Sequence, residues 1–341
     1  MPIEPVDIEQ PESLIAYLRR TSRIGFDEKP KIQNLAGGVS NRTVLVERPT
    51  GEAWVLKQAL VKLRVPEDWF SSPERIHREA LALQWLPQLA PAETITPLIF
   101  EDSEHHLLAM KAIPQPHHNW KTLLLTGQLK RNHVKQFAQL LGTIHCRALA
   151  HRREIASVFD DRSFFESLRL EPYYSYSAMQ VPTAANFLGA LVKETRARRI
   201  TLVHGDYSPK NIVVYENKFI LLDHEVIHFG DPSFDLGFSL THLLSKAHHV
   251  ASHRDAFSEV ANYYWQTYLQ TIGQVSWGPP DLEQDAVRHT LGCLLARVAG
   301  RSPLEYFNDT ERTRQREVVL ELIRNTPTTI PNLIHEFITR L

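Results

Sequence analysis

Residues 201–225 read TLVHGDYSPKNIVVYENKFILLDHE, and this stretch decides the fold. Its apolar runs are typical of buried β-strands, and they flank a polar segment that contains His204-Gly205-Asp206 and Asn211. The sequence on both sides shows helical spacing of apolar residues instead. We therefore expect a small β-rich island, with polar side chains at its strand ends, inside a mostly helical part of the chain.

The polar residues of this island have the spacing that phosphoryl transfer needs. Asp206 precedes Asn211 by five positions, as in the kinase loop H-R-D-x-x-x-x-N. A carboxylate can orient an acceptor hydroxyl and take its proton, while an amide oxygen nearby holds magnesium. Asp223 follows the next apolar run and is placed to bind the same ion. An HGD triplet alone also occurs in ordinary turns, so the combination carries the prediction.

The N-terminal third is expected to form an antiparallel sheet with one helix. Residues 31–47 read as strand, glycine turn and strand, and residues 53–60 read as a third strand that contains Lys57. Ser72 and Pro73 predict the start of a helix over residues 74–86. A second hairpin ends before a proline at position 114, where we place the boundary between an N-lobe, residues 1–113, and a C-lobe, residues 114–341.

Three segments together carry a family resemblance. HGDYSPKN, LLDHE and GDPSFDLGF resemble the signature of the aminoglycoside phosphotransferase and choline kinase superfamily. The resemblance implies an α+β, two-lobed protein-kinase-like fold, with a small antiparallel-sheet N-lobe and a larger, mainly helical C-lobe. It also implies ATP and Mg²⁺ as cofactors, and transfer of the γ-phosphate to a hydroxyl of a small metabolite such as an amino alcohol, a sugar or an aminoglycoside-like molecule.

The resemblance also assigns roles in the N-lobe. GGVSN resembles the nucleotide loop, Lys57 the phosphate-binding lysine, Glu79 its helix partner, and MKAI the hinge to adenine. The residues so implied to bind the nucleotide are Gly37, Gly38, Ser40, Asn41, Lys57, Glu79, Met110, Lys111, Ala112 and Ile113. A GG pair is also an ordinary hairpin tip, and a strand lysine is usually just solvated. Further along the chain, the resemblance suggests that Asp235 braces the catalytic loop, whereas Asp231 fits a helix cap better.

A narrower resemblance concerns the acceptor. LKQAL, Arg64, Trp69 and ERIHREALAL are similar to 5-methylthioribose kinases around the same lysine and helix. Those kinases do not usually carry the loop asparagine, and their metal motif reads DPE where this chain has Asp223-His224-Glu225. The acceptor therefore stays open between amines, sugars and amino alcohols.

Two alternatives from other classes remain. His224-Glu225-Val226-Ile227-His228 spells HExxH, which on a helix would bind zinc and give a hydrolase. The letters follow an apolar strand and soon meet a Gly-Asp-Pro turn, which argues against a helix. A catalytically silent nucleotide-binding regulator would keep the fold, but the lysine, base and metal residues that it would be expected to lose are all present.

Composition limits partners and compartment. Lys plus Arg number 38 and Asp plus Glu 39, so no overall field attracts nucleic acid or an anionic membrane. Cys146 and Cys293 lack any CxxC companion, which fits a reducing cytoplasm. No apolar run approaches the roughly 20 residues of a membrane span, and the start lacks a signal-peptide pattern. We expect a cytoplasmic monomer or homodimer that acts on a small-molecule hydroxyl acceptor, without nucleic acid or membrane partners.

Overall fold

The computed structural model describes residues 6–35, 38–65, 68–278 and 281–341. The chain divides into two compact units. Unit 1 consists of Met1–Leu86 and Ile95–Gln115, and unit 2 of Pro87–Thr94 and Pro116–Leu341. The boundary lies within a helix, α2 (Arg75–Leu89), at the proline inside it.

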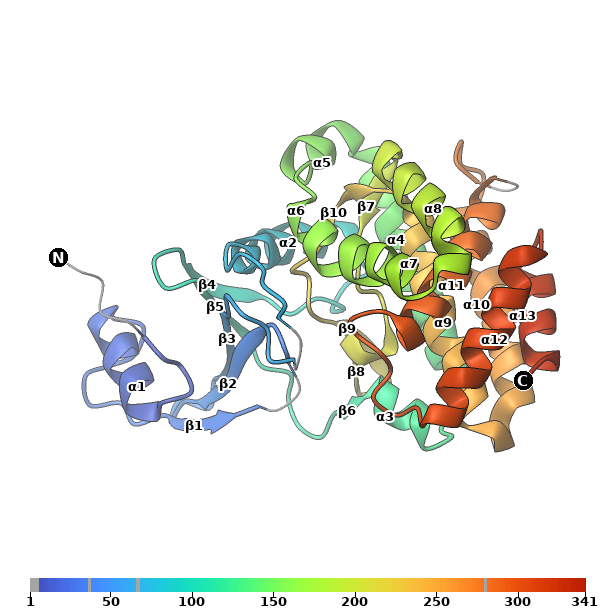
Figure 1. The fold of residues 1–341 in the computed structure, drawn as a ribbon. Helices are drawn as coiled ribbons and strands as arrows, with labels where there is room; N and C mark the ends of the chain where they lie inside the picture. The colour runs from blue at the N-terminus through green and yellow to red at the C-terminus, as the bar shows by residue number, and fades with distance from the viewer. Residues whose placement is uncertain (1–5, 36–37, 66–67, 279–280) are drawn as a thin grey trace. The chain divides into compact units, whose positions relative to one another are not determined.

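Unit 1 is built on a five-stranded antiparallel sheet of order β1-β2-β3-β5-β4 (Figure 1). The strands are β1 (Lys31–Asn34), β2 (Asn41–Glu47), β3 (Ala53–Ala59), β4 (Leu98–Asp102) and β5 (Leu107–Lys111). Residues of β2 and β3 alternate in burial, so Val44, Val46 and Leu56 form a core with Leu14 and Leu18 of α1 (Pro11–Arg20). The predicted antiparallel N-terminal sheet is confirmed.

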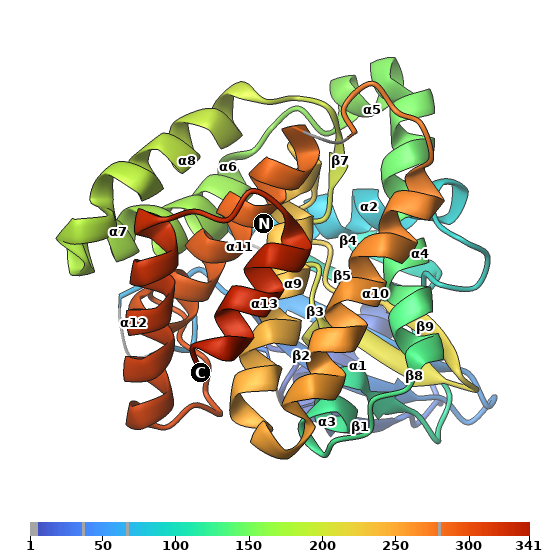
Figure 2. The same cartoon turned by 90° about the vertical axis from the view of Figure 1, so that its right-hand side faces the viewer.

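Unit 2 is mainly helical. Its α-helices are α3 (Trp120–Leu125), α4 (Arg131–Ala150), α5 (Arg152–Val158), α6 (Ser163–Phe165), α7 (Tyr176–Gln180), α8 (Ala185–Ala197), α9 (Pro232–His249), α10 (Arg254–Ile272), α11 (Asp281–Ala299), α12 (Asp309–Arg324) and α13 (Ile330–Thr339). Helix α9 is buried along almost its whole length, because α10, α11 and α13 pack around it (Figure 2). Short 3₁₀ turns lie at η2 (Pro182–Ala184), η3 (Pro209–Asn211) and η4 (Ala251–His253).

Two small sheets in unit 2 form the expected β-rich island. One pairs β7 (Thr201–Val203) with β10 (His228–Gly230), and the other has the order β6-β8-β9. Its strands are β6 (His118–Asn119), β8 (Ile212–Tyr215) and β9 (Lys218–Leu221). The loop between β7 and β8 carries the HGD triplet, so the island positions the polar residues that the sequence singled out.

A π-helix, η1 (Glu166–Ser175), joins α6 to α7 and was not predicted. Its i→i+5 hydrogen bonds widen the helical backbone. This geometry is rare in proteins overall, but where it occurs it is often at a functional site. Pro172 lies inside it and has no N–H to donate. Leu168, Leu170 and Tyr174 are buried, and the Tyr174 hydroxyl contacts His289 Nδ1 at 2.8 Å, which anchors η1 to α11.

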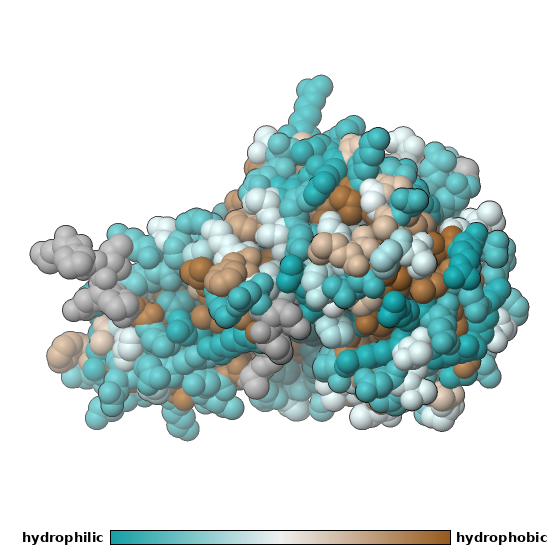
Figure 3. All heavy atoms as spheres, in the orientation of Figure 1, coloured by the Kyte–Doolittle hydropathy of each residue, from teal (hydrophilic) through white to brown (hydrophobic). Residues whose placement is uncertain are grey.

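The outer surface is mixed in polarity. Hydrophilic residues cover most of the face in Figure 3, and hydrophobic residues lie between them in small groups. Phe26 in unit 1 and Met179 in unit 2 are among the large hydrophobic residues that are exposed. Within the part of the chain that the structure describes, no helix has the length and apolar character needed to cross a bilayer.

Candidate active site

The loop between β7 and β8 brings Asp206 and Asn211 into direct contact. The Asn211 amide nitrogen donates to Asp206 Oδ2 at 2.8 Å and to the Asp206 carbonyl at 2.9 Å. Gly205 precedes them with φ +77°, and a Cβ there would lie 3.1 Å from the Val226 carbonyl oxygen. The loop therefore needs glycine at this position. Both polar side chains are largely buried, with 8% and 3% of their residues exposed.

Asp223 lies at the same end of the β8–β9 hairpin as Asn211. Ile212 pairs with Leu221, and the N–H of Leu222 donates to the Asn211 carbonyl at 2.9 Å. Asp223 comes next, half-buried, with φ +67° in the left-handed region. The hairpin thus brings the third sequence-predicted residue beside the other two.

Arg169 is a residue of this site that the sequence did not reveal. It comes from η1, and its Nη2 contacts Asp206 Oδ2 at 2.8 Å. Its Nε donates to the Gly205 carbonyl at 2.9 Å and its Nη1 to the Leu168 carbonyl at 2.7 Å. One guanidinium therefore holds both the carboxylate of Asp206 and the backbone just before it.

Charges around Arg169 show how the acidic groups cluster. Burial acts to lower the pKa of the Arg169 guanidinium, but the negative charge of Asp206, with Glu225 and Asp223, raises it above its ordinary value. Asp223 and Asp206 also act on the pKa of the buried His204 imidazole, which burial nevertheless lowers. The three carboxylates therefore lie close enough to interact through one buried cation.

Asp235 at the start of α9 holds the loop from the protein interior. Its carboxylate accepts the backbone N–H groups of His204 at 2.7 Å and Gly205 at 2.8 Å. Burial alone would raise the pKa of Asp235, but the hydrogen bond from His145 and the surrounding donors lower it. Asp231 caps α9 by accepting Ser233 N–H at 3.0 Å, as the cap reading predicted.

The HExxH letters do not form a zinc-binding helix. Residues 224–228 make a turn and then enter β10, so His224 and His228 lack the one-turn helical spacing that the motif requires. His224 Nδ1 instead faces His204 Nε2 at 3.2 Å, and the Val226 carbonyl lies 3.0 Å from His228 Nδ1. The alternative of a zinc hydrolase at these residues is therefore wrong.

Unit 1 contains the predicted lysine–glutamate pair. Lys57 Nζ on β3 lies 2.7 Å from Glu79 Oε1 on α2. Glu79 is fully buried, and 12% of the Lys57 side chain is exposed. Removing both groups from water makes the pair sensitive to loss of either partner.

The loop before β2 is fixed by a buried arginine that the sequence did not indicate. Ser40 and Asn41 are both buried, and Asn41 Nδ2 donates to Ser40 Oγ at 3.2 Å. The guanidinium of Arg75, at the start of α2, donates to the Ser40 carbonyl and, at 2.8 Å, to that of Leu60. Gly38 lies in the same loop, whereas Gly37 lies outside the described residues.

The predicted hinge, residues 110–113, covers the last two residues of β5 and the two that come after it. Met110 is buried and its sulfur accepts the Thr96 hydroxyl at 3.4 Å. The N–H of Lys111 donates to Pro97, and that of Ala112 donates to Ala53, both at 2.9 Å. Ile113 comes immediately after these bonded positions.

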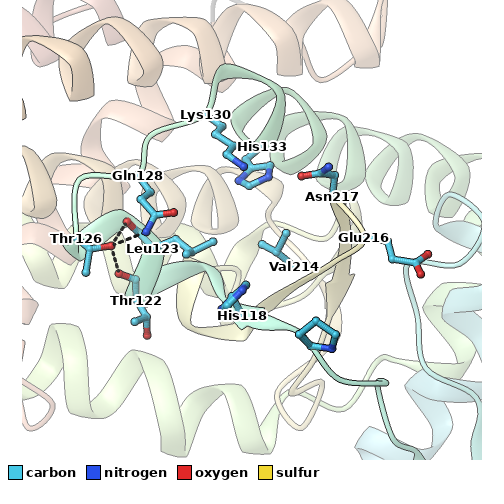
Figure 4. Close-up of a pocket in the computed structure, with 11 residues that line it drawn as sticks. His118, Thr122, Leu123, Thr126, Gln128, Lys130, His133, Val214, Glu216 and Asn217 are labelled. Atoms are coloured by element: carbon cyan, nitrogen blue, oxygen red, sulfur yellow. Dashed lines mark hydrogen bonds between the residues drawn. The ribbon is translucent and has the colours of Figure 1, made fainter.

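A hollow of about 450 Å³ lies elsewhere in unit 2 (Figure 4). Its lining includes His118, Thr122, Lys130, His133 and Glu216, from β6, α3, the N-cap and first turn of α4, and the β8–β9 turn. Asp206, Asn211 and Asp223 are not among the residues that line this hollow. The chemistry-bearing cluster and this hollow are therefore different places.

Comparisons with known proteins agree on one family. The model of the phosphotransferase enzyme family matches residues 31–277. Methylthioribose kinase 1 from Oryza sativa subsp. japonica is 25% identical over 300 residues, which cover 78% of this chain and 68% of the rice protein. A methylthioribose kinase from Yersinia pseudotuberculosis is 22% identical over 219 residues, covering 56% and 52%.

Solved structures share the fold. An amicoumacin kinase in complex with AMP-PNP and Ca²⁺ has a TM-score of 0.58 at 11% identity, covering 92% of this chain and 94% of the other. A choline kinase from Streptococcus pneumoniae has a TM-score of 0.55 at 13% identity, covering 92% and 99%. At these identities the likeness concerns the fold alone, and it confirms the predicted kinase-like class.

Proposed function

The chain belongs to the phosphotransferase enzyme family, and we propose that it transfers the γ-phosphate of ATP to a hydroxyl of a small metabolite, with Asp206 as catalytic base. The observation that carries the proposal is the convergence of Asp206, Asn211 and Asp223 at one end of the β8–β9 hairpin. A carboxylate base beside oxygen ligands for a divalent ion is what phosphoryl transfer to an alcohol requires.

The geometry supports a base held in a fixed orientation. Arg169 and Asn211 both contact Oδ2 of Asp206, each at 2.8 Å. We therefore assign the other oxygen, Oδ1, to the acceptor hydroxyl. Oδ1 takes the hydroxyl proton as the acceptor oxygen attacks the γ-phosphorus, and the bond from that phosphorus to the bridging oxygen breaks, so that ADP leaves. Because the carboxylate cannot swing freely, the acceptor oxygen is aligned before transfer.

The donor set fits magnesium. Asn211 uses its amide nitrogen on Asp206, which leaves its side-chain oxygen for a cation, and Asp223 adds a carboxylate from the same hairpin end. Bound there, Mg²⁺ would neutralise charge on the phosphates during transfer. Glu225 is also buried, and because its charge raises the pKa of Arg169 as those of Asp206 and Asp223 do, it offers a further oxygen ligand in this region.

Unit 1 supplies the proposed nucleotide residues. Lys57 would bind the α- and β-phosphates as a point charge, and its contact with Glu79 fixes the ammonium. Gly37, Gly38, Ser40 and Asn41 would form the phosphate loop. Met110, Lys111, Ala112 and Ile113 would border adenine, with the N–H groups of Lys111 and Ala112 already bonded to their own sheet.

The residues next to Arg169 support one class of acceptor over the others. Arg297 Nη1 donates to the Tyr173 hydroxyl at 2.8 Å, and the Arg169 guanidinium lies 5.8 Å from the centre of the Tyr173 ring. Two buried guanidinium groups around one tyrosine favour acceptors rich in oxygen or negatively charged over cationic ones. We therefore place sugars, such as the methylthioribose named for the relatives, before choline or aminoglycosides.

The test is Mg-ATP consumption over a panel of methylthioribose, other sugars, hydroxy acids, choline and an aminoglycoside. Asp206→Asn should reduce turnover about 10²–10⁴-fold while a fluorescent ATP analogue still binds. Asp255→Asn, an exposed carboxylate in the first turn of α10, is the matched control and should leave turnover unchanged.

Near-normal turnover in Asp206→Asn would show that another group is the base. ATP binding without turnover on any acceptor would favour the alternative of a catalytically silent regulator of the same fold.

A further inference from the structure

Three potential metal ligands from separate elements meet in unit 1. Glu74, His77 and His106 each offer a ligand atom, and these atoms all lie within 4.8 Å of one another. Glu74 directly precedes α2, His77 lies in its first turn, and His106 lies in the turn between β4 and β5. We propose that these residues bind a divalent transition-metal ion, with zinc as the best match. The site does not involve the residues proposed for phosphoryl transfer.

The two imidazoles have the separation of ligands in a tetrahedral site. His77 Nε2 lies 3.2 Å from His106 Nδ1. Two nitrogens bound tetrahedrally to zinc at about 2.0–2.1 Å are about 3.3 Å apart, which follows from the tetrahedral angle. A Glu74 carboxylate oxygen lies 3.8 Å from His77 Nε2, and its other oxygen lies 3.7 Å from His106 Nδ1. The Glu74 side chain is 61% exposed and can move the small remaining distance.

The orientation of His77 supports a ligand role. Its other nitrogen, Nδ1, contacts the carboxylate of Glu101 on β4. When Nδ1 donates its proton to Glu101, Nε2 presents a lone pair toward His106, which is the carboxylate–histidine–metal arrangement. The alternative is a simple hydrogen bond in which His106 Nδ1–H donates to His77 Nε2. The two readings differ in whether the protein takes up a metal ion.

The turn places His106 in an unusual backbone conformation. Its φ is +48°, in the left-handed region that non-glycine residues seldom adopt. The turn thereby holds the imidazole against α2, with the His77 and His106 ring centres 5.4 Å apart. The left-handed conformation of His106 thus brings together two histidines that are remote in sequence.

The ligand types select the ion. Two imidazoles and one carboxylate suit Zn²⁺ and its first-row neighbours, whereas Mg²⁺ prefers oxygen ligands and its own water. The exposed side leaves a fourth position for water. An ion here would tie the start of α2 to the β4–β5 turn, and α2 carries Glu79 two residues after His77. Metal binding would therefore stabilise the helix that holds the Lys57 partner.

The test uses the full chain without any histidine tag, treated with a chelator and titrated calorimetrically with Zn²⁺, in the absence of ATP. We expect one ion per chain. His106→Asn should weaken binding more than 100-fold, because asparagine tolerates the left-handed backbone but removes the imidazole. Glu101→Gln should weaken it about 10–100-fold by releasing His77. Glu104→Gln, an exposed carboxylate in the same turn, should leave the affinity unchanged.

Co²⁺ gives a second readout, since the visible absorption of tetrahedral Co²⁺ should appear in the wild type and vanish in His106→Asn. No Zn²⁺ uptake by the wild type would establish the simple hydrogen bond and overturn the proposal. Equal Zn²⁺ affinity in the wild type and His106→Asn would overturn it as well. Because ATP is absent, neither result depends on whether the chain phosphorylates an acceptor.

Discussion

Each unit contains a buried ion pair, and the member that we propose for the chemistry is the cation in one and the anion in the other. In unit 1, Lys57 and Glu79 lie 2.7 Å apart, and the proposed working group is the cation. In unit 2, Arg169 and Asp206 lie 2.8 Å apart, and the proposed working group is the anion. In the proposal, Glu79 fixes Lys57 and Arg169 fixes Asp206, so burying a charge would set the direction of the working group as much as add stability.

The two pairs differ in the elements that hold them. Lys57 lies in the middle of β3, paired with both neighbouring strands, and Glu79 lies in α2. Arg169 comes from a π-helix and Asp206 from an irregular loop. The strand and the helix that carry the first pair were predicted from sequence patterns, and the pairing itself was implied by the family resemblance. The second pair depends on an irregular element, so only one of its members was found.

The largest expected effect is on stability, from breaking the pair in unit 1. Lys57→Met should lower the free energy of unfolding by about 3–5 kcal/mol, because the Glu79 carboxylate remains buried without its lysine. Urea unfolding of the full chain measures it. A Lys57→Met, Glu79→Leu double variant should recover most of the loss, since it removes both charges. A single-variant cost below about 1 kcal/mol would mean that the pair behaves like an exposed one.

Breaking the second pair should mainly affect turnover. Arg169→Met removes contacts to Asp206 and to the carbonyls of Gly205 and Leu168, so kcat should fall about 10–100-fold while KM for ATP is kept. Arg169→Lys should lie between, because an ammonium cannot reproduce the planar set of donors. Steady-state kinetics with the best acceptor of the panel tests this. An unchanged kcat in Arg169→Met would contradict the positioning role.

Lowering the pH should destabilise unit 2 more than unit 1. Burial lowers the pKa of five histidines in unit 2: His133, His204, His242, His248 and His289. In the described part of unit 1, His77, His105 and His106 are each intermediate in burial. The pKa of His289 falls to about 3. In the unfolded chain His289 has its ordinary pKa near 6.5, so below that pH it binds a proton that the folded state does not bind. The free energy of unfolding therefore decreases as pH falls from about 6.5 toward 3.

The slope should be up to about 1.4 kcal/mol per pH unit for this one residue. Hydrogen exchange resolved along the chain should show unit 2 opening first as pH is lowered. His289→Gln should flatten the pH slope of the unfolding free energy, whereas His335→Gln, exposed on α13, should not. Equal slopes in both variants would assign the acid sensitivity to other groups.

The smallest effect should come from an exposed pair that joins the same π-helix to α8. Glu166 and Arg196 lie 2.8 Å apart, and 54% of the Arg196 side chain is exposed. Glu166→Gln should cost less than about 1 kcal/mol in unfolding free energy. A larger loss would mean that η1 depends on this contact, and that this exposed pair contributes to stability as the buried pairs do.

What the sequence predicted well rests on short-range patterns. Alternating apolar residues predicted the strand that contains Lys57, and a proline-marked start predicted the helix that carries Glu79. Asp206, Asn211 and Asp223 lie close together because Asn211 contacts Asp206 and the β8–β9 hairpin brings Asp223 next to Asn211. The structure brings those three together, and their roles remain predictions that the variants above test.

What the sequence missed depends on long-range packing or on rare backbone geometry. Arg169 reaches Asp206 from a π-helix, which has no recognised sequence period. His77 and His106 lie on separate elements, and only the packing of α2 on the β4–β5 turn brings them together. HExxH is the reverse case: its letters match a helical motif, but the apolar strand before it and the Gly-Asp-Pro turn after it correctly argued against a helix.

The π-helix also bears on how such a chain can evolve. An i→i+5 segment holds one more residue than the α-helix that it interrupts, so it behaves as an insertion that the fold has absorbed. Deleting one residue within Glu166–Ser175 would let the segment close as an α-helix and would put a different side chain where Arg169 now stands. A change in length over this short stretch could thus exchange the group that faces Asp206 while the loop that carries Asp206 keeps its sequence.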